Sequence, residues 1–146
     1  MPGRLTVFGA RELLTSYFAR TTEPPPTFYL ALIKEIAPTP YLSGSELDEP
    51  DVADYARIAI DNDLANWVND SQPQEIYNAQ SGQFATAITD WGKISYWALC
   101  NAEVDGFNLL VGELENPVLI SAGDQVTFEE GDLNVTLGPF FLAEED

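Results

Sequence analysis

Apolar and polar residues recur with two different periods along this chain, and the first of them is helical. In GARELLTSYFART, apolar residues recur at intervals of three and four, and neither glycine nor proline interrupts residues 10–20. This spacing predicts a short amphipathic helix over about residues 10–20, which the following TTEPPP segment ends. The apolar residues of this helix are Leu13, Leu14, Tyr17 and Phe18.

The segment after the prolines changes to a strand pattern. TFYLALIKEIA is rich in aromatic and branched residues and lies between Pro26 and Pro38, which predicts a buried strand of about eight residues. Residues 39–54 combine prolines, a glycine and several carboxylates, which is typical of a long surface loop. The next segment, YARIAI, alternates only loosely, so a strand is favoured there and a short helix remains an alternative.

The second half of the chain consists of short strand-like runs. EIYNAQ, QFATAI, GKISYWALCNA, NLLVGEL, PVLISA, QVTFEEG and LNVTLGPFF are separated by Gly, Pro, Asn or Asp about every ten residues, as in antiparallel sandwiches and barrels. Within GKISYWALC, strict alternation would place Ile94 on the face opposite Trp97. Turn signals occur at Asp105–Gly106, Gly123 and Gly131, and Pro117 is expected to open a strand.

These patterns together predict a mainly β single domain, an antiparallel β-sandwich of jelly-roll type with a short N-terminal helix. Residues 1–26 would form an N-terminal arm that includes the helix, and residues 27–146 the β-rich domain. A length of 146 residues with 45% hydrophobic residues is enough for one domain with a real core.

The net charge of the chain limits the classes of partner that it is expected to bind. Six basic and 24 acidic residues give a formal charge of −18, which argues against nucleic acid and anionic membranes as partners because both are bound through Lys and Arg. No apolar run is long enough for a transmembrane helix, and the first residues do not resemble a cleaved leader. The single cysteine, Cys100, excludes an intrachain disulfide framework. It favours synthesis in a reducing, intracellular compartment.

The sequence offers no convincing catalytic, cofactor or metal site. It contains no histidine, no G-x-S-x-G elbow and no glycine-rich phosphate loop, and Cys100 lies within an apolar strand. A pair of carboxylates is too common among 24 acids to indicate a glycosidase. Asp61 and Asp63 have the spacing of calcium ligands, but Asn66 and Gln72 occupy the glycine and glutamate positions of an EF-hand loop. We therefore expect no enzyme and no cofactor.

Three tryptophans leave one binding role open. Trp67, Trp91 and Trp97 could line a sugar-binding platform, although tryptophans in a β-rich chain more often belong to the core.

The order of the segments from YARIAI to LNVTL resembles a family of small structural proteins of tailed phages, labelled as capsid cement or as tail-fibre-like proteins. The resemblance covers most of the chain and looks like a folding signature rather than a site. The matching residues are Tyr55, Ala56, Arg57, Trp91, Gly92, Ile94, Asn108, Leu109, Leu110, Gly112, Pro117, Gly123, Asp124, Phe128 and Gly131.

The resemblance implies a virion structural protein, made in the bacterial host cytoplasm. A compact domain without repeats or heptads, and with a charge that opposes self-association, favours a capsid cement protein on the head surface. Its partners would be the major capsid protein and copies of itself, as a dimer or trimer. The alternatives are a tail-fibre-like or receptor- or carbohydrate-binding virion protein, and an acidic binding protein unrelated to virions. The candidate capsid contacts are Leu5, Val7, Phe8, Phe140 and Phe141.

Overall fold

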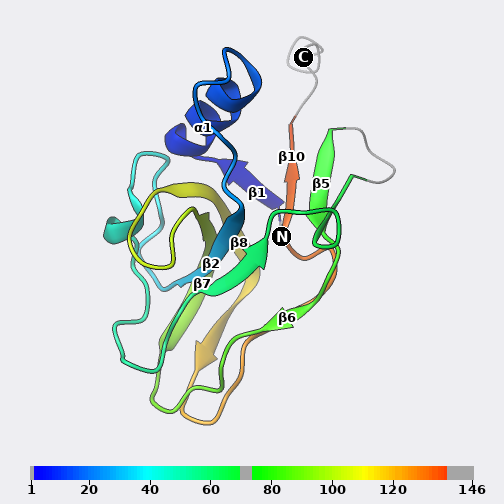
Figure 1. Ribbon diagram of the computed structural model, residues 1–146. Helices are drawn as coiled ribbons and strands as arrows, with labels where there is room; N and C mark the ends of the chain where they lie inside the picture. The colour runs from blue at the N-terminus through cyan, green and yellow to red at the C-terminus, as the bar shows by residue number, and fades with distance from the viewer. Residues whose placement is uncertain (1, 70–73, 138–146) are drawn as a thin grey trace, which may run out of the picture.

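The computed structural model describes residues 2–69 and 74–137, which form a small β protein with one helix (Figure 1). Its elements in chain order are β1 (Pro2–Leu5), α1 (Val7–Tyr17), β2 (Thr27–Ile33), the short 3-10 helix η1 (Gly44–Glu46), β3 (Ile58–Asp61), β4 (Trp67–Val68), β5 (Glu75–Asn78), β6 (Gly82–Gln83), β7 (Gly92–Cys100), β8 (Asn108–Ile120), β9 (Thr127–Phe128) and β10 (Asn134–Thr136). The prediction of a mainly β chain with a short N-terminal helix is confirmed.

The described strands form one large curled sheet and one small sheet. The large sheet has eight strands in the order β3-β2-β7-β8-β1-β10-β5-β4, and β6 pairs with β9 in the small one. The predicted antiparallel jelly-roll sandwich differs from this arrangement in two ways. The large sheet is mixed, because β1 runs parallel to β10, and it has no second sheet of similar size to face.

The helix begins three residues earlier than its periodicity predicts, because Thr6 caps it. The Thr6 side chain accepts a hydrogen bond from the Gly9 N–H at 3.0 Å, which satisfies one of the unpaired donors at the helix start. The helix ends at Tyr17, and Ala19 and Arg20 then turn the chain with φ of 62° and 54°. Left-handed backbone of this kind commonly follows a helix, at some cost when the residue is not glycine.

The start of the chain contributes a strand that the sequence analysis did not predict. β1 lies between β8 and β10, pairing with Gly112, Val111 and Leu110 on one side and with Asn134 and Val135 on the other. Four residues are too few to show a period, so this strand depends on its neighbours for its stability. Part of the predicted N-terminal arm thus lies within the sheet.

β7 and β8 form the longest pairing, and an irregularity within it corrects two predictions. The register shifts between Ile94 and Tyr96, so Ile94 shares a core cluster with Trp97 instead of lying on the opposite face. On β8 the pairing passes from Glu113 to Val118 across the same irregularity. Pro117 therefore does not open a strand but lies inside β8, in the irregular stretch between the paired residues Glu113 and Val118, where a proline without an N–H is best tolerated.

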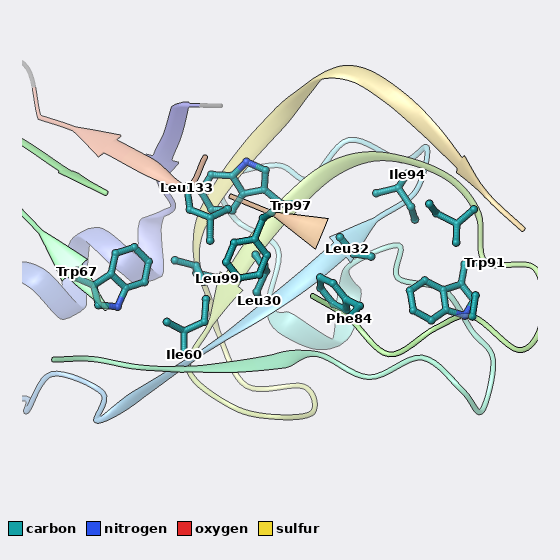
Figure 2. Close-up of a cluster of buried hydrophobic side chains, with 13 residues drawn as sticks. Leu30, Leu32, Ile60, Trp67, Phe84, Trp91, Ile94, Trp97, Leu99 and Leu133 are labelled. Atoms are coloured by element: carbon teal, nitrogen blue, oxygen red, sulfur yellow. The ribbon is translucent and has the colours of Figure 1, made fainter. Parts of the chain in front are cut away.

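The buried side chains form two clusters, one on each face of the central strands. Alternating residues of β2 and β7 divide between the clusters, as the pleat requires. The larger cluster lies on the concave face (Figure 2) and includes Leu30, Leu32, Ile60, Trp67, Phe84, Trp91, Ile94, Trp97, Leu99 and Leu133. The smaller cluster consists of Ala31, Ile33, Leu47, Ala98 and Cys100.

The predicted turns form where the sequence placed them. Gly123 and Gly131 have φ of 96° and 85°, and the aspartate after each accepts a hydrogen bond from the backbone N–H three residues before it, Asp124 from Ser121 and Asp132 from Glu129. Asp63 likewise accepts bonds from the N–H groups of Ala65 and Asn66, which is ordinary turn chemistry.

Candidate functional site

The residue types that could carry chemistry are not arranged as a reactive or metal-binding site in the described residues. Among residues 2–69 and 74–137, no group of three or more His, Cys, Asp or Glu is placed to hold a metal ion. Burial raises the pKa of Cys100 to about 12, which keeps its thiol protonated and unreactive at neutral pH. In the same described ranges, no helix has the length and apolar character needed to span a membrane.

The tryptophans belong to the core rather than to a sugar-binding surface. Trp67, Trp91 and Trp97 are 8%, 3% and 1% exposed, and Figure 2 shows all three among the apolar side chains of the larger cluster. A stacking platform needs an exposed ring face, which none of them offers.

The Arg57 side chain links its own segment to two loops, residues 44–49 and residues 102–105. Its side chain is 4% exposed, and its Nη2 lies 2.6 Å from Glu49 Oε1. The guanidinium also donates to the carbonyl oxygens of Gly44, Ala102 and Asp105 at 2.9–3.1 Å. Tyr55 donates its hydroxyl proton to Glu49 at 2.6 Å, and burial, with the charge of Glu49, raises the pKa of Tyr55. This part of the family signature is a buried structural network.

A second network fixes the loop before β7. Asp54 accepts hydrogen bonds from Thr89 Oγ1 at 2.6 Å, from Trp91 Nε1 at 2.9 Å, and from the N–H groups of Ile88 and Thr89. These bonds, above all that from Thr89, hold the pKa of Asp54 below its usual range. Asp54 was not identified from the sequence, since one acid among five in a polar loop carries no distinguishing pattern.

The other residues of the family signature contribute to packing and to turns. Gly92 has a φ of 92°, Leu109 is buried, Leu110 packs against the larger cluster, and Gly112 lies beneath Trp97. They are spread over β7, β8 and the turns instead of converging on one point.

The five candidate capsid contacts are differently placed. Leu5 is half-buried in β1, whereas Val7 is 46% exposed at the start of α1. Phe8 packs on Phe107 with ring centroids 4.9 Å apart, so it contributes to holding the helix. Phe140 and Phe141 lie outside the described residues.

The first turn of helix α1 packs closely against β8 and is hydrogen-bonded to it. The Thr6 N–H donates to the Leu109 carbonyl at 3.0 Å, and the Thr6 hydroxyl donates to Asn108 O. Gly9 lies so close to this strand that a Cβ there would be 2.0 Å from the Leu109 carbonyl oxygen. Only glycine permits this approach, and the rest of the helix extends beyond the strand (Figure 1).

Because Gly9 is the residue of the helix that packs against β8, the apolar residues further along the helix face outward. Leu13, Leu14, Tyr17 and Phe18, called the α1 patch from here on, are 43%, 56%, 77% and 63% exposed. Tyr17 and Phe18 touch edge to face with centroids 5.0 Å apart. The sequence identified these residues correctly as one apolar set, but Gly9 and not this set faces the sheet. An exposed apolar cluster of this kind is typical of a protein-protein contact.

The N-terminal segment that carries the α1 patch is basic, whereas the rest of the molecule is strongly acidic. Residues 1–22 hold Arg4, Arg11 and Arg20 with Glu12 as their one acid, so the rest of the chain carries three basic and 23 acidic residues. Arg11 lies over the rings of Phe8 and Phe107 at 5.9 and 6.0 Å. The ion pairs within residues 2–69 and 74–137 are Lys34–Asp48 and Arg57–Glu49, so none of the three N-terminal arginines is paired there.

A cavity of about 470 Å³ on the concave face is the other candidate site. Its apolar lining, including Leu32, Ile94 and Trp97, belongs to the larger core cluster. Binding sites usually combine such a lining with a few converging polar groups. Here the polar residues are Glu115, Asn116, Gln125, Thr127 and Asp132. Of these, Gln125 is already bonded to the Phe84 carbonyl, and Asp132 already accepts from the Glu129 N–H. The α1 patch is therefore the stronger candidate.

Comparison with known families supports one of the two virion interpretations over the other. Residues 5–136 match the family model described as podophage GP4 fiber I protein gp80. The chain belongs to this family. No curated protein matches the chain.

Membership of this family identifies the chain as a phage structural protein. The matched region includes α1 and every strand after it up to β10. The family is one of fibre proteins, so it supports the tail-fibre alternative and not the capsid cement protein that the resemblance first favoured. The reasoning from compactness was misleading, because the absence of repeats in one chain does not exclude a fibre built from other parts.

Proposed function

We propose that this chain is a non-enzymatic subunit of the tail fibre and that it is attached to neighbouring virion proteins through the α1 patch. The observation that carries the proposal is the outward apolar set Leu13, Leu14, Tyr17 and Phe18 on a helix fixed by its other end. Family membership supports the location, and the patch supports the mode of attachment.

The composition of the patch fits a binding surface. Aromatic side chains with close neighbours are the usual anchors of protein interfaces, and Tyr17 and Phe18 form such a pair. Burying one large apolar side chain fully contributes about 1.5–3 kcal/mol, so a few half-exposed residues supply a useful part of an interface. Arg11 and Arg20 add a positive rim, which favours an acidic or neutral partner surface.

Attachment is better supported than recognition of a carbohydrate receptor. The three tryptophans are buried, and the concave cavity has few free polar groups around its apolar lining. A structural subunit needs no histidine, metal or reactive thiol, which agrees with the surroundings of Cys100.

The location is tested by separating purified virions into heads and tails and counting copies of this chain in each fraction by quantitative mass spectrometry. We expect a small, defined number of copies that co-purify with tails. Hundreds of copies on heads would overturn the tail-fibre assignment and restore the capsid cement interpretation. An epitope tag is best avoided at α1, since it would cover the patch.

A further inference from the structure

We propose that the α1 patch of one copy binds the opposite end of a second copy of this chain, at a surface formed by Val52, Ala53 and Ile88. This surface is called the Ile88 face from here on. The inference rests on the proposed function, because it names the neighbour to which the α1 patch attaches. The contact joins two different surfaces, so it can repeat from copy to copy and either close into a ring or continue as an open array.

The Ile88 face combines an exposed apolar side chain with a hollow beside it. The hollow has a volume of about 540 Å³ and is lined by Val52, Ala53, Asp54, Ile88 and Thr89. The Ile88 side chain is 76% exposed, whereas Val52 packs against the larger core cluster. A single exposed isoleucine is ordinary on a protein surface, but one that adjoins an apolar hollow offers an anchor and a recess to a partner.

The backbone that presents Ile88 is fixed by Asp54. The Asp54 carboxylate accepts hydrogen bonds from the N–H groups of Ile88 and Thr89 at 2.7 and 3.2 Å. The same carboxylate accepts a bond at 2.9 Å from Nε1 of Trp91, whose ring is buried in the core. A surface whose backbone is held in place before binding loses little conformational freedom when a partner arrives. Ile88 is therefore exposed on a pre-organised segment.

The charges around the two surfaces are of opposite sign. Asp54 lies in the wall of the hollow, and the exposed Asp51 and Asp90 are adjacent in sequence to residues that line it. The α1 patch lies beside Arg11 and Arg20, and neither arginine has an ion-pair partner within residues 2–69 and 74–137. An apolar surface with an acidic rim thus complements an apolar surface with a basic rim.

The two surfaces lie at opposite ends of the molecule. In Figure 1, α1 is at the top, and the segment between β6 and β7, which contains Ile88, turns at the bottom. A single copy therefore cannot cover its α1 patch with its own Ile88 face. Two copies placed end to end bury one surface of each kind and leave the other two free for further copies.

The net charge of −18 does not exclude this contact, because the charge is unevenly distributed. Residues 1–22 contain three basic residues and one acid, and the rest of the chain contains three basic and 23 acidic residues. At physiological ionic strength, exposed charges more than about 8 Å apart are largely screened. The charges closest to an end-to-end contact are of opposite sign and favour it, whereas two α1 patches facing each other would bring arginines together.

Self-association of the full chain tests the proposal through two variants that each lose one surface. Leu14→Asp places an acid in the α1 patch, and Ile88→Lys places a base on the Ile88 face. The matched controls are Leu119→Asp and Leu64→Lys, which make the same changes at side chains that are 67% and 94% exposed elsewhere. Sedimentation velocity over a series of protein concentrations measures the association of each protein and of mixtures.

We expect the original protein and both controls to associate, and each surface variant alone to associate at least about tenfold more weakly, as the loss of one anchor residue implies. An equimolar mixture of Leu14→Asp and Ile88→Lys should form a dimer and nothing larger, since each variant supplies the surface that the other lacks. This dimer would also show that both variants are folded.

Three results would overturn the proposal: an original protein that stays monomeric at every concentration, a mixture that stays monomeric, or an Ile88→Lys variant that associates as well as the original. The last result would assign the α1 patch to a different surface. The proposed function can survive such a failure. If Leu14→Asp is excluded from tails although the original protein is monomeric in solution, the patch binds another virion protein and only the end-to-end contact is wrong.

Discussion

The indole ring of Trp97 lies directly over Gly112 on the neighbouring strand. The two residues are paired between β7 and β8, and a Cβ on Gly112 would be 2.2 Å from both Nε1 and Cε2 of the ring. The same ring passes Gly3 of β1, where a Cβ would be 2.7 Å from Cη2. One side chain thus packs across three adjacent strands, and two glycines make room for it.

Replacing Gly112 with alanine should destabilise the fold by about 1–3 kcal/mol, because the added methyl group forces the buried indole out of its position. Urea unfolding followed by tryptophan fluorescence measures the change. Gly112 is not among the glycines with positive φ, so left-handed backbone strain does not contribute to this cost. Trp97→Phe should reduce the cost of the alanine if the ring is the cause, and an unchanged cost would contradict the explanation.

Removing Arg57 should be among the most costly single changes in the described chain. Arg57→Ala leaves Glu49 without its cationic partner and three loop carbonyls without the guanidinium donor. Losing one partner of a buried ion pair typically costs about 3–5 kcal/mol. Arg57→Lys should restore only part of this, because one ammonium group cannot contact all these acceptors together. Equal stability of the lysine variant and the original protein would show that the fork geometry is unimportant.

Asp54 should make the protein sensitive to acid. Its pKa is lowered in the folded state, so its contribution is fully present above the unfolded value of about 3.9 and is lost as the pH falls through the folded value. In Asp54→Asn, the dependence of unfolding free energy on pH below about pH 4 should be shallower by up to about one proton. Chemical unfolding at a series of pH values gives this slope, and an unchanged slope would contradict the hydrogen-bonded role of Asp54.

Gly9→Ala should loosen α1 while leaving the sheet folded. The added Cβ would meet the Leu109 carbonyl, which is backbone and cannot rotate away. Hydrogen exchange should therefore accelerate over residues 7–18 and stay slow in β2 and β7. Uniform acceleration over the whole chain would mean that the helix is part of the cooperative core and not a mounted element.

The sequence predicted the elements whose pattern is local. β2, β5 and the turns at Gly123 and Gly131 follow from alternation, branched residues and positive-φ glycines. The helix was recognised from its spacing, although Thr6 as its cap was not. The prediction of a strand at QFATAI, residues 83–88, is largely wrong, since only Gln83 of this segment lies in a strand, at the end of β6.

The features that the sequence did not predict depend on contacts between distant residues. β1 is a strand because β8 and β10 pair with it, and the register shift near Ile94 arises between two strands rather than in either alone. The orientation of α1 is decided by Gly9 against Leu109, a pair 100 positions apart. Spacing showed which helix residues belong together, but it could not show that they face outward.

The most direct test of the attachment surface compares two virion variants that differ only in where an acidic side chain is placed. Leu14→Asp alters the α1 patch, and Leu119→Asp alters a similarly accessible position outside it, opposite Lys93 of β7, since the two side chains are 56% and 67% exposed. Both proteins should fold with nearly unchanged stability, and the Leu14 variant should be incorporated into tails at least about tenfold less, a change equivalent to 1.4 kcal/mol. Equal incorporation of the two variants would contradict the assignment of the α1 patch as the surface that holds this chain in the fibre.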